Sequence, residues 1–335
     1  MTDATSTAPE APPPRAGEQR GARFLARLEE AVSRAVVGGE LPLRLLATSL
    51  LAGGHALVED VPGVGKTLLA RAFARSLGLT FSRVQGTPDL LPSDVTGSSV
   101  LEGSTFRFMP GPVFANVLLV DEINRATPRT QSALLEAMQE RQVSAEGETR
   151  PLPDPFLVLA TQNPVELEGT FALPEAQLDR FVLRIAMGYP EEDAERRIAR
   201  RHQAAAEPLD DVASVIGVDE TLELRSVART VHVSEDVERY GVALVRATRE
   251  HPDVRLGASP RASVALYRVA QAWALLGGRD FVLPDDMREV AHAVLDHRLL
   301  LEVDRELRGA TVSGVISEVL DSVPVPMADD EPPAG

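Results

Sequence analysis

The chain has 335 residues, 44% of them apolar and 25% charged, and this length favours two domains. It contains no cysteine, which excludes disulfides, thiolate metal sites and cysteine nucleophiles, and its formal net charge of −16 argues against nucleic acid or an anionic membrane as main partner. No apolar run reaches the roughly 18 residues that a membrane span needs, and residues 1–20 lack the apolar core of a secretory signal, so we expect a cytoplasmic protein that is not an integral membrane protein.

The predicted fold is an α/β domain over residues 21–190, between a disordered tail at residues 1–20 and the domain that follows it. Five short apolar runs in this domain alternate with helical stretches, which is typical of buried parallel strands with helices on both faces of the sheet. The runs occupy residues 55–59, 80–85, 116–122, 155–163 and 180–187.

Two further segments have recognisable patterns. Residues 142–153, with Glu146-Gly147 at their centre, predict a hairpin before the fourth strand. Beyond residue 190 only helical patterns follow, and three of the four longest begin with proline in the first turn. We therefore expect an all-helical domain over residues 191–320 and a disordered acidic tail over residues 321–335.

A glycine-containing loop joins the first predicted strand to a helix. Strand, loop and helix in this order form a phosphate cradle, because backbone N–H groups and the positive helix end face the anion. Lys66 would neutralise the β and γ phosphates of a nucleotide, and the Thr67 hydroxyl would bind Mg²⁺. Lys66 is also the single lysine among 34 basic residues, which an ordinary glycine turn does not explain. The predicted binding residues are Asp60, Pro62, Gly63, Val64, Gly65, Lys66, Thr67 and Leu68.

One position departs from the usual GxxxxGK[ST] pattern, because Asp60 stands where that pattern has glycine. A carboxylate there would repel phosphate unless it is paired or points away. The departure leaves the strength of nucleotide binding open.

Two acids follow the third predicted strand. A buried parallel strand delivers its last residues to the carboxyl edge of the sheet, so Asp121 and Glu122 should face the phosphates. Asp121 would hold Mg²⁺ through water, and Glu122 would polarise the attacking water. The alternative is a solvated acidic strand end.

Three more polar residues are candidates for the chemistry. Asn163 follows the fourth strand and could orient the attacking water, or it could cap a turn. Arg180 could reach a neighbouring subunit as a transition-state arginine, or it could pair locally with Asp179. Arg261 lies in the first turn of a helix, where a cation opposes the helix dipole, so a nearby anion would explain its placement; a solvated arginine is the alternative.

In this order, these motifs resemble the MoxR family of AAA+ ATPases over about residues 25–300. The resemblance is carried by GHALVEDVPGVGKT, QGTPDLLPSDVTG, FRFMPGPVFANVLLVDEINRATPRTQSALLEAMQERQV, LVLATQNP, LPEAQLDRF and GASPRA. It implies a P-loop AAA+ core followed by a helical lid. It also implies ATP and Mg²⁺ as ligands.

The resemblance assigns roles to the candidate residues. Lys66 and Thr67 correspond to Walker A and Asp121 and Glu122 to Walker B. Three single residues correspond to sensor 1 (Asn163), the arginine finger (Arg180) and sensor 2 (Arg261), and whether sensor 2 acts within its own subunit or across stays open. The likeness extends to magnesium chelatase ATPase subunits, whose insertions would fall at about residues 90–108 and 142–153.

The family also implies partners. Its members are regarded as chaperone-like ATPases that form hexameric rings and act with proteins carrying a von Willebrand factor A domain, often to mature a client or insert a cofactor into it. Residues 191–320 lack the D-x-S-x-S run of such a domain, so we expect another protein to supply it.

Three other functions use a nucleotide site of this kind. A GTPase would need the lysine of N-K-x-D, and no lysine remains beyond Lys66. A nucleic-acid-directed AAA+ ATPase shares the core, but the acidic composition and the 4% of aromatic residues do not favour it. A nucleotide-dependent scaffold with little hydrolysis is the third alternative, and Asp60 keeps it open.

Overall fold

The computed structural model describes residues 16–59, 63–145, 147–162, 169–201 and 208–326. At its centre is a parallel five-stranded sheet in the order β2-β5-β8-β1-β9. Each predicted strand run contains one of these strands, so the predicted α/β sheet is confirmed. The strands are β1 (Ala56–Glu59), β2 (Phe81–Gln85), β5 (Val117–Asp121), β8 (Leu157–Gln162) and β9 (Leu183–Ile185).

Helices bury both faces of this sheet. Leu118 and Val120 of β5 point into one apolar core and Val117 and Leu119 into the other, as the alternation of side chains along a strand requires. The first core is covered by α5 (Pro128–Glu140). The second lies under α1 (Ala16–Ser33), α2 (Glu40–Ala52) and α3 (Lys66–Ser76). Burial on both faces explains why the strands are continuous apolar runs.

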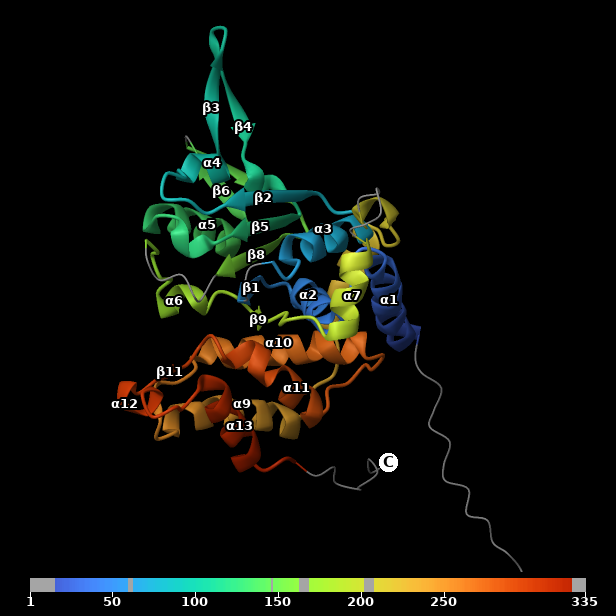
Figure 1. Cartoon of the computed structure of the whole chain (residues 1–335), viewed down its shortest axis with the longest axis vertical. Coiled ribbons are helices and arrows are strands. Elements are labelled where there is room, and N and C mark those ends of the chain that lie inside the picture. Colours follow the sequence, from blue (N-terminus) through green and yellow to red (C-terminus); the bar gives the residue numbers. More distant parts are fainter. Residues whose placement is uncertain (1–15, 60–62, 146, 163–168, 202–207, 327–335) are drawn as a thin grey trace, which may run out of the picture.

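The C-terminal part packs against the β9 edge of the sheet (Figure 1). Its helical character agrees with the predicted lid, apart from one short antiparallel pair, β10 (Val254–Leu256) and β11 (Leu300–Leu301). These two strands are too short to show a period in the sequence. The helices after β9 are α7 (Glu192–Arg201), α8 (Val218–Ala228), α9 (Glu235–Glu250), α10 (Pro260–Leu276), α11 (Pro284–Leu295), α12 (Val303–Glu306) and α13 (Val312–Ser322).

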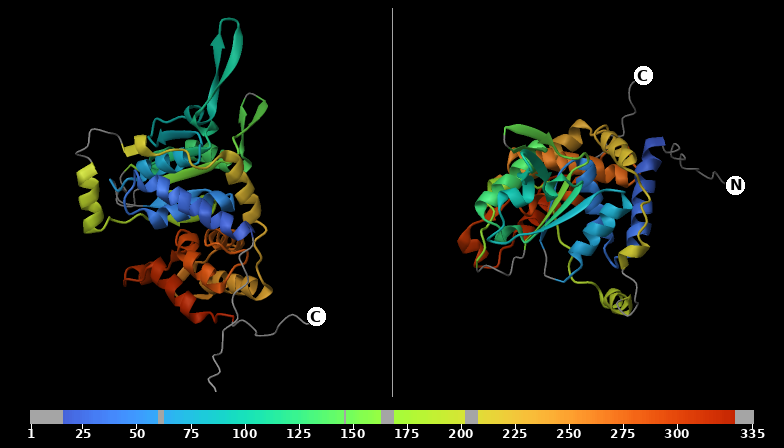
Figure 2. Two further views of the ribbon diagram at one scale, coloured as in Figure 1. Left: turned by 90° about the vertical axis from the view of Figure 1, so that its right-hand side faces the viewer. Right: turned by 90° about the horizontal axis from the view of Figure 1, so that it is seen from above.

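Two hairpins project from the opposite end of the molecule (Figure 2). One follows α4 (Pro92–Thr96) and pairs β3 (Gly97–Glu102) with β4 (Thr105–Pro110), where the family resemblance implies an insertion. The other pairs β6 (Gln142–Ala145) with β7 (Glu148–Pro151) and confirms the predicted hairpin. The Arg150 guanidinium lies 4.0 Å from the centre of the Phe108 ring and links the two hairpins.

Short elements complete the chain. They are α6 (Glu175–Leu178) and the 3-10 turns Pro112–Phe114, Ile123–Arg125 and Pro208–Asp211. Within the described parts of the chain, no helix is both long and apolar enough to cross a membrane.

The first helix begins earlier than the sequence predicts. Residues 16–20, assigned to the N-terminal tail, form the start of α1. At this end of the helix Arg20 pairs with Glu223 at 2.5 Å, and the next residue, Gly21, packs directly on the backbone of Leu275. At the other end, α13 extends to Ser322, past the expected start of the acidic tail at residue 321. Residues 1–15 and 327–335 of the expected tails lie outside the described residues.

Candidate functional site

The glycine loop after β1 provides an open backbone cradle. Gly63 and Gly65 have φ angles of 87° and 91°, which favour glycine, and a β-carbon at either would meet no atom within 4 Å among the described residues. Space is therefore left above the loop for a ligand. Two predicted binding residues, Asp60 and Pro62, lie outside the described residues.

Helix α3 begins at the cradle. Lys66, Thr67 and Leu68 are its first three residues, and Gly65 is its N-cap. The first turn of α3 carries no acidic side chain, so the N–H groups at this helix end and the Lys66 ammonium add to the positive potential there. This arrangement is suited to binding phosphate.

Asp121 is the last residue of β5 and is only 7% exposed. The Arg83 Nε–H donates to its Oδ2 at 2.5 Å, and the Thr161 hydroxyl donates to its Oδ1 at 3.3 Å. The pairing of β5 with β8 brings Thr161 to this position, since the register aligns Val120 with Ala160. A carboxylate held in this way at the carboxyl edge of a parallel sheet is not a solvated strand end.

Glu122 follows Asp121 in a left-handed backbone conformation, with a φ of 54°. Its N–H donates to Thr161 Oγ1 at 2.8 Å, which fixes the turn. Its carboxylate Oε2 accepts hydrogen bonds from Gln85 Nε2 at 3.0 Å and from Arg125 Nη1 at 3.2 Å. The Glu122 carboxylate therefore has a fixed orientation at the end of β5.

Strand β8 separates β5 from β1 in the sheet, so the end of β8 lies between the acids and the glycine loop. Its last residue, Gln162, pairs with Glu59, the last residue of β1. The next residue in the chain, Asn163, lies outside the described residues.

Arg180 and Arg261 line one shared pocket of about 380 Å³ between the sheet domain and the lid. Neither side chain forms an ion pair within the described part of the chain, and the Nε of Arg180 is buried without a hydrogen-bond partner there. The alternative of a local pair between Arg180 and Asp179 is not seen in the described part of the chain, where Asp179 pairs with Arg298 and accepts from Ser259 instead. Three further arginines line the pocket: Arg141, Arg268 and Arg298.

The pocket lies at the amino ends of the sheet strands, whereas the glycine loop lies at their carboxyl ends. Gly53, Gly54 and His55 line it and precede β1, whereas the loop follows β1. Arg180 precedes β9, which runs parallel to β1, so it lies at the same edge as residues 53–55. Each chain therefore presents the glycine loop at one end of the strands and the arginine-lined pocket at the other.

The pocket wall carries an excess of positive charge. Burial lowers the pKa of the Arg141 guanidinium, and the neighbouring Arg225 lowers it further, while Asp154 opposes both. Arg229 and Arg268 act on Arg141 in the same direction as Arg225. Such an arrangement favours an anionic group from outside the chain.

Several residues at these sites were not predicted from the sequence. Arg83 and Gln85 reach the acids from β2, and Thr161 reaches them from β8. The only signal for them was a polar residue at or near the end of a predicted strand. Arg298 was missed altogether, because its partners lie far away in the sequence.

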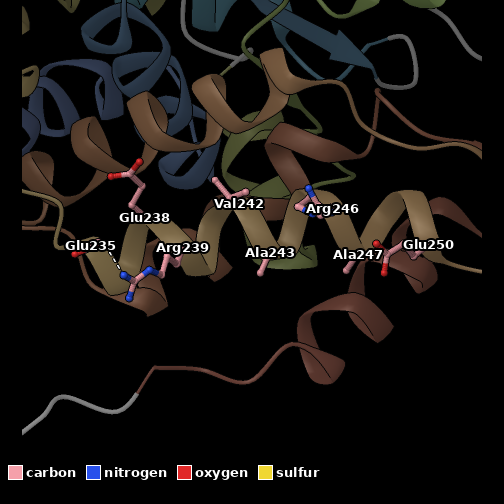
Figure 3. A pocket seen from close by; sticks show the side chains of 8 residues that line it. All are labelled: Glu235, Glu238, Arg239, Val242, Ala243, Arg246, Ala247 and Glu250. Atoms are coloured by element: carbon pink, nitrogen blue, oxygen red, sulfur yellow. Dashed lines mark hydrogen bonds and ion pairs between the residues drawn. The ribbon is translucent and has the colours of Figure 1, made fainter.

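A separate hollow of about 600 Å³ lies on the lid and contains none of the predicted site residues (Figure 3). All of the side chains that line it come from α9, so it is the outer face of one helix rather than a site between elements. They are Glu235, Glu238, Arg239, Val242, Ala243, Arg246, Ala247 and Glu250.

Comparison with known proteins agrees with this organisation. The model of the ATPase family associated with various cellular activities (AAA) matches residues 55–183, and the model of the AAA lid domain matches residues 246–318. The first range contains the glycine loop, the two acids and Arg180. The second contains Arg261.

Relatives that match over most of both chains identify the family more closely. YeaC of Bacillus subtilis, whose name assigns it no function, is 46% identical over 91% of this chain and 95% of its own. Chaperone MoxR1 of Mycobacterium tuberculosis is 43% identical over 98% of this chain and 90% of its own. A solved structure from Cytophaga hutchinsonii, described provisionally as an ATPase, has a TM-score of 0.86 at 39% identity and covers 92% of this chain and 98% of that one.

These matches span both the sheet domain and the lid, in agreement with the two sites described above. The chain therefore belongs to the MoxR family of AAA+ ATPases, and its activity is the hydrolysis of ATP.

Proposed function

We propose that the loop residues Gly63 to Gly65 and the start of α3 bind the triphosphate of ATP, with Lys66 on the β and γ phosphates. The open space above Gly63 and Gly65 supports this assignment, as does the absence of acids in the first turn of α3. The lone ammonium of the chain would lie where the developing negative charge is greatest. Asp60, Pro62 and Val64 of the loop and Leu68 of α3 belong to the same proposed binding site.

Mg²⁺ would be held by the Thr67 hydroxyl and, through water, by the Asp121 carboxylate. These are oxygen donors, which Mg²⁺ prefers, and the buried Asp121 is already oriented by Arg83 and Thr161. The bound ion would supply charge neutralisation between the β and γ phosphates.

Glu122 would orient and polarise the water that attacks the γ-phosphate. Its carboxylate is held from Gln85 and Arg125, which supports a fixed position rather than a mobile one. Asn163 would share this role from the end of β8.

The observation that carries the proposal is the placement of the two arginines at the sheet edge opposite the cradle. A cradle at one edge and an arginine pocket at the other match a head-to-tail interface, which closes into a ring when the rotation permits. We propose a hexameric ring in which Arg180 of one subunit stabilises the charge at the neighbour's γ-phosphate. Because Arg261 lines the same pocket, it would also act across the interface.

We further propose chaperone-like remodelling of a client in the cytoplasm, together with a protein that carries a von Willebrand factor A domain. The name of the MoxR1 relative supports the chaperone role. The β3–β4 hairpin offers a contact for another protein, since it projects from the molecule with Phe106 76% exposed and Leu101 opposite it. An ATP-loaded Glu122→Gln variant should retain the partner and client in affinity capture. Recovery of the bait alone would count against this role.

Mixing two inactive variants tests the interface. Lys66→Ala should lose ATP binding but keep its arginine pocket, while Arg180→Ala should keep the cradle but lose the arginine. Neither should hydrolyse ATP alone. A 1:1 mixture should recover about a quarter of the parental turnover, because random assembly places an intact cradle beside an intact pocket at one interface in four. A mixture as inactive as its components would rule out action across subunits.

A further inference from the structure

One carboxylate, that of Asp179, connects Arg180 to Arg261. Asp179 comes directly before Arg180, at the C-cap of α6. Its Oδ2 accepts a hydrogen bond from Ser259 Oγ at 2.8 Å, and its Oδ1 accepts one from Arg298 Nε at 2.8 Å. Both donors belong to the lid, so the residue next to Arg180 is held from the lid rather than by the sheet.

Ser259 extends this connection to Arg261. It is the N-cap of α10, and its Oγ accepts a hydrogen bond from the Arg261 N–H at 3.1 Å. The same hydroxyl therefore accepts a hydrogen bond from the Arg261 backbone N–H and donates one to Asp179. The backbones of Arg180 and Arg261 are thus joined through two side chains.

Arg298 gives the connection a rigid base. Its side chain is only 2% exposed. Its remaining N–H groups donate to the Phe181 carbonyl at 2.5 Å, to the Val182 carbonyl at 3.2 Å and to the Val294 carbonyl. With the Asp179 carbonyl, which accepts from Nη2 at 3.4 Å, five acceptors hold this guanidinium, so it has little freedom to move and fixes Asp179 in place.

We propose that Asp179 is a positioning residue that holds Arg180 and Arg261 at a fixed separation, so that the two arginines act as one unit on the ATP of the neighbouring subunit. This inference rests on the proposed function. Its physical reason is that stabilisation of developing charge depends on preset geometry, and a misplacement of about 1 Å can lower turnover by up to about a hundredfold.

Replacing Asp179 should have an effect on the neighbouring subunit that replacing a purely structural residue would not have. An Asp179→Asn subunit should bind ATP in its own cradle as the parent does, yet fail to support hydrolysis in its neighbour. We expect turnover of the pure variant to fall by about tenfold to a hundredfold, with the affinity for a non-hydrolysable ATP analogue unchanged.

Mixing separates this inference from the proposed function. A 1:1 mixture of Asp179→Asn with Lys66→Ala should regain about a quarter of parental turnover, because the Lys66→Ala subunit supplies intact arginines to a cradle in the Asp179→Asn subunit. No recovery here, when Arg180→Ala with Lys66→Ala does recover, would overturn the role of Asp179. Failure of both mixtures would instead overturn action across subunits.

A second variant is needed because Asp179→Asn removes the anion that faces the buried Arg298 and could unfold the protein. Ser259→Ala breaks the link to α10 and leaves Asp179 and Arg298 paired. It should lower turnover by about tenfold at an unchanged affinity for the analogue, while Ser259→Thr, which keeps the hydroxyl, should restore most of the activity. Parental turnover in Ser259→Ala would show that the connection does not position the arginines.

Discussion

Glu122 depends on a glycine in the neighbouring strand connection. Gly86 follows β2, and its N–H donates to the Asp121 carbonyl at 2.6 Å. A β-carbon at Gly86 would lie 2.2 Å from the Glu122 carbonyl oxygen and 2.9 Å from its carbonyl carbon. Because backbone rather than a flexible side chain is in the way, the turn that carries Glu122 would have to move.

We therefore expect Gly86→Ala to lower kcat by about tenfold to a hundredfold while ATP still binds at the cradle. Steady-state hydrolysis and binding of a fluorescent ATP analogue would separate the two effects. Gly217→Ala is a matched control, because a β-carbon at that position meets nothing within 4 Å among the described residues. Equal activity of the two variants would show that the Glu122 turn tolerates displacement.

His55 is a buried base that must remain neutral. Its Nδ1 accepts from the Val158 N–H at 3.0 Å, so its Nε2 carries the proton that is donated to the Met138 carbonyl at 3.1 Å. Burial lowers the pKa of His55 to about 4, and the positive charge of Arg141 adds to this effect. Burial likewise lowers the pKa of His297 well below its ordinary value.

The lowered pKa of His55 makes stability depend on pH. Between about pH 6.5 and 4 the unfolded chain binds a proton at this residue and the native chain does not, so this contribution is fully present above pH 6.5 and is lost as the pH falls toward 4. From pH 7 to pH 5 the loss should be about 2 kcal/mol for this residue alone.

Urea unfolding at several pH values would measure this contribution. His55→Gln should lose less stability between pH 7 and pH 5 than the parent, by about the same 2 kcal/mol, with His297 accounting for part of what remains. His232→Gln, which changes an exposed histidine, is the control. An unchanged pH slope in His55→Gln would mean that another group causes the acid sensitivity.

One arginine of β9, Arg184, joins strand β1 to helix α11. Arg184 of β9 pairs with Glu59, the last residue of β1, at 2.8 Å and with Asp296, the C-cap of α11, at 2.6 Å. All three side chains are partly buried, and without Arg184 two carboxylates would face each other. The lid is therefore held to the β1 end by charge as well as by apolar packing.

Arg184→Met should lower the free energy of unfolding by about 1–3 kcal/mol, because it leaves partly buried carboxylates without their partner. Arg196→Met is the matched control: it removes an exposed i,i+4 pair with Glu192 on α7 and should cost about 0.5 kcal/mol or less. Denaturant unfolding of both variants would test the difference. Equal losses would indicate that solvent screens the Arg184 pairs as fully as the surface pair.

The elements differ in how far the sequence could predict them. The five sheet strands were predictable because burial on both faces makes each one a continuous apolar run. Strands β10 and β11 were not, since three and two residues show no period and pair only when the lid folds. The start of α1 was misplaced for a similar reason, because Arg20 and Gly21 gain their partners from helices far along the chain.

The same distinction holds for the candidate sites. Lys66, Asp121 and Glu122 were predictable because each follows its strand directly and a parallel sheet brings strand ends together. The contacts that orient them depend on strand register, which the sequence did not reveal for Arg83 or Gln85. The connection from Asp179 to Ser259 and Arg298 depends on where the lid docks, and no local pattern contains that information.

The distribution of charge over the chain is uneven. The net charge is −16, yet five arginines line the pocket that holds Arg180 and Arg261, with Asp179 as its one acidic lining residue among those described. Copies of a chain with this net charge repel one another at long range. Assembly through the arginine pocket would therefore need an anion at the opposing edge, and bound ATP supplies one.

ATP should consequently drive assembly. In the Glu122→Gln background, where hydrolysis is slow, we expect ATP to shift the particle from small species to rings at micromolar protein, as measured by mass photometry. Replacing both Arg180 and Arg261 by alanine should raise the concentration needed for assembly by about tenfold to a hundredfold, because the phosphates would then face no cation across the interface. Added salt should weaken assembly of the parent more than that of this double variant.

A matched double variant, Arg196→Ala with Arg239→Ala, removes two exposed arginines whose partners lie on their own helices, and it should assemble as the parent does. If the pocket variant assembled equally well with ATP, the arginine pocket would not be the face that meets the neighbour's nucleotide.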